Sequence, residues 1–116
     1  MTVADVVSFI IKHRRGKAFY KYSVPDIVGV VMQGIEDNTL GIVKNPAGEI
    51  EGICIAHKND RMKYLHIMHI LTIRKGLVRK LLELKRSLYP DYTISGNRHG
   101  RLKEFKPELI AAFERI

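Results

Sequence analysis

Two histidines three residues apart, His66 and His69, are the side chains whose type and spacing suggest acid–base chemistry. They fall within an apolar run, residues 63–73, that predicts a long strand. Successive side chains of a strand point to opposite faces, so residues three apart lie on opposite faces. The pair therefore cannot share a metal ion, and we expect at most one imidazole to face a cleft. A neutral imidazole is a suitable general base near neutral pH, and packing in the core is the alternative.

The elements around this strand predict an α/β (α+β) fold in a single domain, residues 1–116. The first three strands are expected to form an antiparallel meander. The strand–helix–strand unit after it predicts a parallel pair, because such crossovers are right-handed, and helices then cover both faces of a mixed sheet. Apolar spacing and turn residues predict helices at 3–13, 23–36, 75–88 and 109–113, strands at 39–45, 49–58, 63–73 and 92–95, and a polar, basic segment at 97–106.

The charge of the chain is uneven. Residues 57–106 contain 13 Lys and Arg against 4 Asp and Glu, whereas residues 1–56 contain 6 of each, in a chain of net charge +8. A basic half favours a polyanionic partner, such as a phosphate-bearing cofactor, nucleic acid or an acidic protein surface; a solvated basic surface is the alternative. A single cysteine, Cys54, and the lack of a secretory signal or membrane span predict a cytoplasmic protein with no membrane partner.

The junction between the central strand and the next helix has the residues of an anion-binding turn. Gly76 opens the predicted helix, with Arg74 and Lys75 before it and Arg79 within the first turn. Free N–H groups at a helix N-terminus bind phosphate oxygens, and glycine lets the backbone approach them closely. An ordinary helix start with a solvated basic face is the alternative.

This junction and the order of elements over residues 2–97 resemble the GCN5-related N-acetyltransferase family. In that family the turn has a Gln/Arg-x-x-Gly-x-Gly/Ala signature and cradles the pyrophosphate of coenzyme A. Here Gly76 matches the first glycine, Ile73 stands where Gln or Arg is expected, and Val78 stands where the second small residue is expected.

The resemblance implies a protein that uses acetyl-CoA as co-substrate, needs no metal, and acetylates an amine of a small molecule or of a protein lysine or N-terminus. The family uses a base near the central strands and a tyrosine as acid. Phe105 lies nearest to the expected tyrosine and has no proton to donate. The implied catalytic residues are therefore His69, His66 and Tyr92. The implied coenzyme A site comprises Leu71, Ile73, Arg74, Lys75, Gly76, Leu77, Val78, Arg79 and Asn97.

Two further interpretations stay open. The chain ends without the family's final hairpin, which suits a small or degenerate member, truncated at its C-terminal end, that binds partners without catalysis. Arg98, Arg101 and Lys103 lie in the basic segment and predict contact with a nucleic-acid backbone. Alternatively, the chain is a small virus-encoded accessory protein that binds or inhibits a protein in the host cytoplasm, as a monomer or homodimer.

Overall fold

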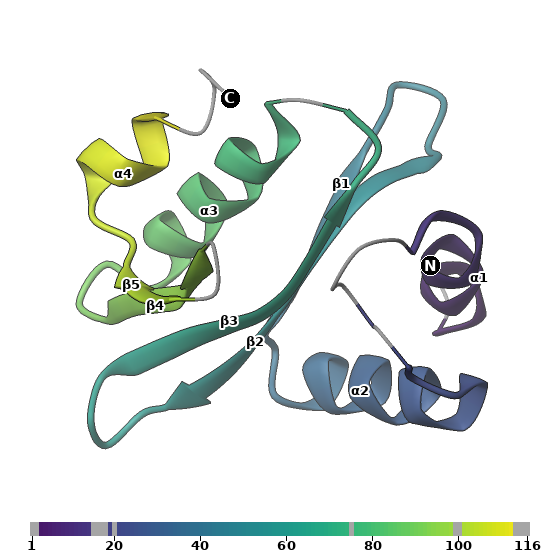
Figure 1. Cartoon of the computed structure of the whole chain (residues 1–116), viewed down its shortest axis with the longest axis horizontal. Coiled ribbons are helices and arrows are strands. Elements are labelled where there is room, and N and C mark those ends of the chain that lie inside the picture. Colours follow the sequence, from purple (N-terminus) through teal and green to yellow (C-terminus); the bar gives the residue numbers. More distant parts are fainter. Residues whose placement is uncertain (1–2, 15–18, 20, 75, 99–100, 113–116) are drawn as a thin grey trace.

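Four helices and five strands make up the part of the chain that the computed structural model describes, residues 3–14, 19, 21–74, 76–98 and 101–112. The strands form one sheet, with α1 and α2 on one face and α3 and α4 on the other (Figure 1). In chain order the elements are α1 Val3–His13, α2 Val24–Glu36, β1 Leu40–Lys44, β2 Ile50–Asn59, β3 Tyr64–Thr72, α3 Leu77–Leu88, β4 Thr93–Arg98, β5 Arg101–Glu104 and α4 Pro107–Ala112.

The sheet is mixed, and its strands lie in the order β1-β2-β3-β4-β5. β1, β2 and β3 form the predicted antiparallel meander, and β4 pairs with β3 in parallel after the α3 crossover. The expected mixed α+β architecture is therefore confirmed. β5 was not predicted: it pairs antiparallel with β4 and turns the expected basic segment into a hairpin.

Local residue chemistry explains where the early elements begin. At the start of α2, the Ser23 hydroxyl accepts a hydrogen bond from the Asp26 N–H at 3.2 Å, and the Asp26 carboxylate accepts one from the Ser23 N–H at 3.2 Å. This capping box satisfies two donors that the helix leaves free. At the β1–β2 turn, Gly48 has a φ of +86°, which a residue without a Cβ adopts readily.

An irregularity in β3 changes which side chains share a face. Ile55 of β2 is opposite His69, but Ala56 is opposite Ile67, so Met68 is an extra residue on β3. Such a β-bulge shifts the alternation of side chains by one residue. His66 and His69 therefore lie on the same face of the sheet. The expectation that they lie on opposite faces is wrong, because it assumed a regular strand.

Each face of the sheet has its own apolar core. On the α3 side, Leu65, Ile67 and Ile94 of the sheet pack with α3 residues such as Leu81 and Leu82. The other core has a different set of members: Val6, Val7, Phe9, Ile10, Phe19, Ile27, Val31, Ile53, Ile55 and Leu71. Since α1 packs on β2 and β3 and α2 on β1 and β2, the helices of this side leave β4 and β5 beyond their edge (Figure 1).

The buried stripe of α3 includes a lysine and leaves out the last leucine of the helix. Lys85 is only 1% exposed, whereas Leu88 is 68% exposed. Lys85 is four residues after Leu81 and so continues the buried line of the helix. Its Nζ donates a hydrogen bond to the Thr39 carbonyl, and the loss of hydration lowers the pKa of this amine.

Within the described residues, no helix is long and apolar enough to cross a membrane.

Candidate functional site

The first feature of the site is the point where β3 and β4 stop pairing. The parallel register joins Tyr64–Ile67 to Thr93–Gly96 and stops there, although β3 continues to Thr72. Asn97 and Arg98 of β4 instead pair with β5. The backbone N–H and C=O groups of β3 that face β4 therefore lose their sheet partner just where Met68 forms the bulge.

The start of α3 is the second feature. Its N-cap is Gly76, with a φ of +85°, and no side chain caps the helix. A Cβ built on Gly76 would have no atom within 4 Å, so the turn is open on that side. The first N–H groups of a helix without a side-chain cap remain available to an acceptor, and the helix dipole favours an anion there. The turn can therefore hold a phosphate group.

A hydrogen-bonded group of three side chains lies beside the last paired residues of β3 and β4. The hydroxyl of Ser95, a residue only 4% exposed, contacts the Tyr64 hydroxyl and lies 3.1 Å from Nδ1 of His66. His66 and Ser95 are direct neighbours in the parallel register. Their side chains lie on the face away from α3, since the alternating residues Leu65, Ile67 and Ile94 belong to the α3-side core.

His69 belongs to a second group, formed with the connection between α1 and α2. Its ring stacks on Phe19 with centroids 4.3 Å apart, and its Nε2 lies 3.1 Å from the Tyr22 hydroxyl. Burial lowers the pKa of His69, so its imidazole is neutral at neutral pH. A neutral imidazole bonded to a hydroxyl can accept a proton, which is the property expected of a base.

The other predicted catalytic residue, Tyr92, does not join these groups. It precedes β4, at the amino end of the parallel pair, whereas α3 begins beyond the carboxyl end of β3. Its hydroxyl donates a hydrogen bond to the Asp60 carboxylate, which raises the pKa of Tyr92 to about 12. The structure therefore places Tyr92 at the end of the sheet opposite the open turn.

The predicted coenzyme A residues divide into those at the open turn and those that serve the core. Leu71 and Leu77 are buried on opposite faces of the sheet, and Val78 packs against the α3-side core. The Ile73 N–H donates to the Glu51 carbonyl at 3.0 Å, which extends the β2–β3 pairing. Asn97 is exposed on β4.

Two of the cations near the turn, Arg74 and Arg79, already form ion pairs. The Arg74 guanidinium donates to the Glu51 carboxylate at 2.9 Å, and Nε of Arg79 donates to the Glu83 carboxylate at 2.8 Å. Lys75 lies outside the described residues. Backbone N–H groups, more than these guanidinium groups, are thus the donors that the turn offers.

The basic hairpin forms the outer edge of the sheet. Arg98 ends β4 and pairs with Arg101 of β5, and both Arg101 and Lys103 are exposed. β5 has no neighbouring strand on its other side among the described residues. Within that same part of the chain, no group of three or more metal-ligating side chains comes together.

Sequence reasoning missed Ser95 and Tyr22, the residues that connect the two histidines to neighbouring elements. A serine next to Ile94 in a short predicted strand was a weak signal of a buried polar site. Nothing in the local sequence indicated that Tyr22 would reach β3, since that contact joins residues 47 positions apart.

Comparison of the sequence with protein-family models and with curated proteins identifies no relative. No protein-family model matches the chain, and no curated protein matches it at a significant level. The function must therefore be argued from the site itself.

Proposed function

We propose that this chain binds acetyl-CoA as a protein of the GCN5-related N-acetyltransferase type and transfers the acetyl group to an amine. The observation that carries the proposal is the junction of β3, β4 and α3. There the parallel pairing stops after Ile67 and Gly96, a bulge follows at Met68, and an uncapped helix starts at Gly76. Unpaired strand backbone beside an uncapped helix start supports the proposal, because the resemblance implies a cofactor whose pyrophosphate binds at this turn.

The phosphate end of the co-substrate fits the Gly76 turn. A Cβ on this glycine would have no atom within 4 Å, and no side chain of the described residues caps the first N–H groups of α3. Phosphate oxygens accept hydrogen bonds well from such groups, and the dipole of the helix adds to the attraction. Ile73 and Val78 depart from the signature, so the proposed binding depends on the turn at Gly76 alone.

The two histidine groups supply the proton transfers that acetyl transfer requires. The amine attacks the thioester carbonyl carbon, the C–S bond breaks, the amine loses a proton, and the thiolate gains one. His69, neutral because of its burial, suits the role of base. Ser95 can donate to Nδ1 of His66, which leaves the proton on Nε2 of His66 for the thiolate. This group replaces the missing tyrosine in the acid role, and Tyr64 can return a proton through Ser95.

Thermal unfolding with acetyl-CoA tests the binding step. A ligand at about 100 times its Kd adds about 2.7 kcal/mol to the free energy of unfolding, so the midpoint should rise by several degrees. Gly76→Asp should remove this rise by placing a carboxylate in the phosphate site. Gly48→Asp is the matched control, since that glycine also has a positive φ and open space but lies at the β1–β2 turn. No rise with millimolar acetyl-CoA, or an equal loss in both variants, would contradict the proposal.

Thiol release from acetyl-CoA in the presence of amines tests the transfer step. His69→Gln and Ser95→Ala should each lower kcat by about 10²-fold or more while acetyl-CoA binding persists. Binding without thiol release for any amine would make the chain a catalytically inactive acyl-CoA-binding module. We also propose a cytoplasmic location, because a single cysteine, Cys54, cannot form a disulfide within the chain.

A second candidate function, binding to a nucleic-acid backbone, is favoured by Arg101 and Lys103, the exposed cations of β5. Replacing Arg98, Arg101 and Lys103 together by Ala should weaken binding and flatten its dependence on salt, by about one unit of slope per lost phosphate contact. Lys44→Ala, at the other edge of the sheet, is the control. Salt-insensitive binding, or none, rules this function out.

A further inference from the structure

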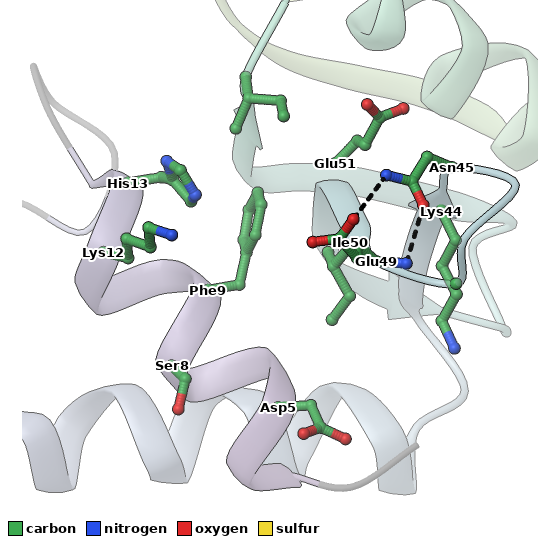
Figure 2. Close-up of a pocket in the computed structure, with 12 residues that line it drawn as sticks. Asp5, Ser8, Phe9, Lys12, His13, Lys44, Asn45, Glu49, Ile50 and Glu51 are labelled. Atoms are coloured by element: carbon green, nitrogen blue, oxygen red, sulfur yellow. Dashed lines mark hydrogen bonds between the residues drawn. The ribbon is translucent and has the colours of Figure 1, made fainter.

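A pocket between α1 and the β1–β2 hairpin lies apart from the two histidine groups and shares Glu51 and Ile73 with the residues described above. Its volume is about 470 Å³, which is in the range of small-molecule sites. Figure 2 shows α1 on one side of it and the hairpin on the other. The lining residues are Asp5, Ser8, Phe9, Lys12, His13, Lys44, Asn45, Gly48, Glu49, Ile50, Glu51 and Ile73.

Asp5 on α1 and Lys44 on the hairpin give each wall both signs of charge, but at the end of α1 a basic segment lies across from carboxylates (Figure 2). Lys12 and His13 come from the last turn of α1, and Glu49 and Glu51 come from the hairpin opposite (Figure 2). Glu49 precedes β2, and the β1–β2 register shifts at Glu51, so their two-residue spacing does not place both side chains on one face of the sheet. In most folded proteins such walls would be expected to close into ion pairs.

These walls do not close. Among the described residues, Lys12 makes no ion pair with either glutamate of the opposite wall, and His13 only contacts the Phe9 ring. The carboxylate of Glu51 is held by Arg74, and that of Glu49 accepts a hydrogen bond from the Asn45 amide at 3.3 Å. Both carboxylates are thus positioned by residues of their own side.

The floor between the charged walls is apolar. Phe9 is 7% exposed and stands between α1 and the hairpin, with its ring centroid 4.8 Å from that of His13 (Figure 2). Ile50 and Ile73 complete the apolar surface. A ligand there would bury an apolar group of moderate size and meet a cation-binding wall on one side and an anion-binding wall on the other.

We propose that this pocket binds a free α-amino acid with an apolar side chain. Its ammonium group would lie against Glu49, its carboxylate against Lys12 and His13, and its side chain on Phe9. Charge-assisted hydrogen bonds of both signs would then replace the ion pairs that the walls do not make with each other. The proposal does not depend on acetyl transfer, since the pocket lies at Ile73 and is not lined by His66, His69 or Gly76.

Three related probes separate this ligand from other occupants. Leucine carries both charges, leucinamide lacks the carboxylate, and N-acetylleucine lacks the ammonium group. Titration of isotope-labelled protein by NMR should show saturable shifts of α1 and hairpin amides with leucine at about millimolar concentration. Each analogue should bind about tenfold more weakly or worse, because it leaves one charged wall without a partner.

Matched variants locate the site. Glu49→Gln and Lys12→Gln should each weaken leucine binding about tenfold, whereas Glu36→Gln on α2 and Lys80→Gln on α3 should leave it unchanged. The proposal is overturned if leucine causes no saturable shift, if the analogues bind equally well, or if the pocket variants bind like wild type. It is also overturned if acetyl-CoA displaces leucine competitively, because the pocket would then belong to the co-substrate site. Failure of acetyl-CoA to bind at all leaves the leucine result intact, so the two proposals fail separately.

Discussion

The two faces of the sheet differ in what covers them. On the α3 face, apolar side chains from β2, β3, β4, α3 and α4 form a continuous core. On the other face, α1 and α2 cover the meander, and the sheet beyond them is polar: His57, His66, Ser95 and Glu104 stand side by side in the register of β2, β3, β4 and β5. The covered face stabilises the fold, whereas the open part of the opposite face is free to carry chemistry.

The largest difference in the free energy of unfolding is expected between leucine-to-alanine variants on the two faces. Leu81→Ala in the α3-side core should lower the free energy of unfolding by about 2–5 kcal/mol, because it leaves a cavity in a fully buried site. Leu102→Ala, on β5 and 65% exposed, should change it by less than about 0.5 kcal/mol. Chemical denaturation of both variants measures the difference. Similar losses would show that the β5 side of the sheet is not an open surface.

A smaller loss of stability is expected at Gly96, where the pairing of β3 and β4 ends. A Cβ at Gly96 would lie 2.6 Å and 2.8 Å from atoms of the Phe105 ring, so Gly96→Ala should cost about 1–3 kcal/mol through overpacking. Gly29→Ala, within α2 and with no atom near its Cβ, should instead stabilise by about 0.5–1 kcal/mol. Adding Phe105→Leu to Gly96→Ala should give a double variant less destabilised than the two single losses predict. Strict additivity would contradict the packing described for Gly96.

The pH dependence of stability distinguishes His69 from an exposed histidine. Burial lowers the pKa of His69 from its usual 6.5 in the folded state, so only the unfolded chain takes up the proton readily just below that pH. The free energy of unfolding should therefore be level above about pH 6.5 and fall as the pH drops toward the folded-state pKa. His69→Gln should remove this part of the fall. Identical profiles for wild type and variant, from denaturation midpoints, would show that His69 is solvated.

The smallest expected effect on stability is at the amino end of the parallel strands β3 and β4. Asp60→Asn removes the charge that holds the Tyr92 hydroxyl, so the pKa of Tyr92 should drop from about 12 toward its usual value of about 10. Stability should change little, since this contact is at the surface. Absorbance titration of the tyrosines measures the shift. A simultaneous loss of acetyl-CoA binding would return Tyr92 to the candidate site.

Much of the framework was predictable because its signals are local. Ser23 and Pro25 fix the start of α2, the turn at Asn45–Gly48 fixes the hairpin, and the leucine spacing of α3 fixes a helix beside a parallel pair. β5 was missed because its four residues are all exposed and carry no apolar alternation.

The site was harder to predict because it depends on one irregular residue and on distant contacts. The bulge at Met68 is set by pairing with β2 and cannot be seen in β3 alone, yet it brings His66 and His69 to one face. The burial of Lys85 depends on a distant contact, since its Nζ donates a hydrogen bond to the Thr39 carbonyl 46 positions earlier in the chain.

The most direct test of the central claim is to locate acetyl-CoA on the isotope-labelled protein by NMR. The account predicts the largest amide shifts at Gly76, Leu77 and Val78, where the phosphates bind, and at Met68, where β3 loses its pairing with β4. Shifts confined to the basic β4–β5 hairpin, or the absence of saturable shifts anywhere, would contradict it.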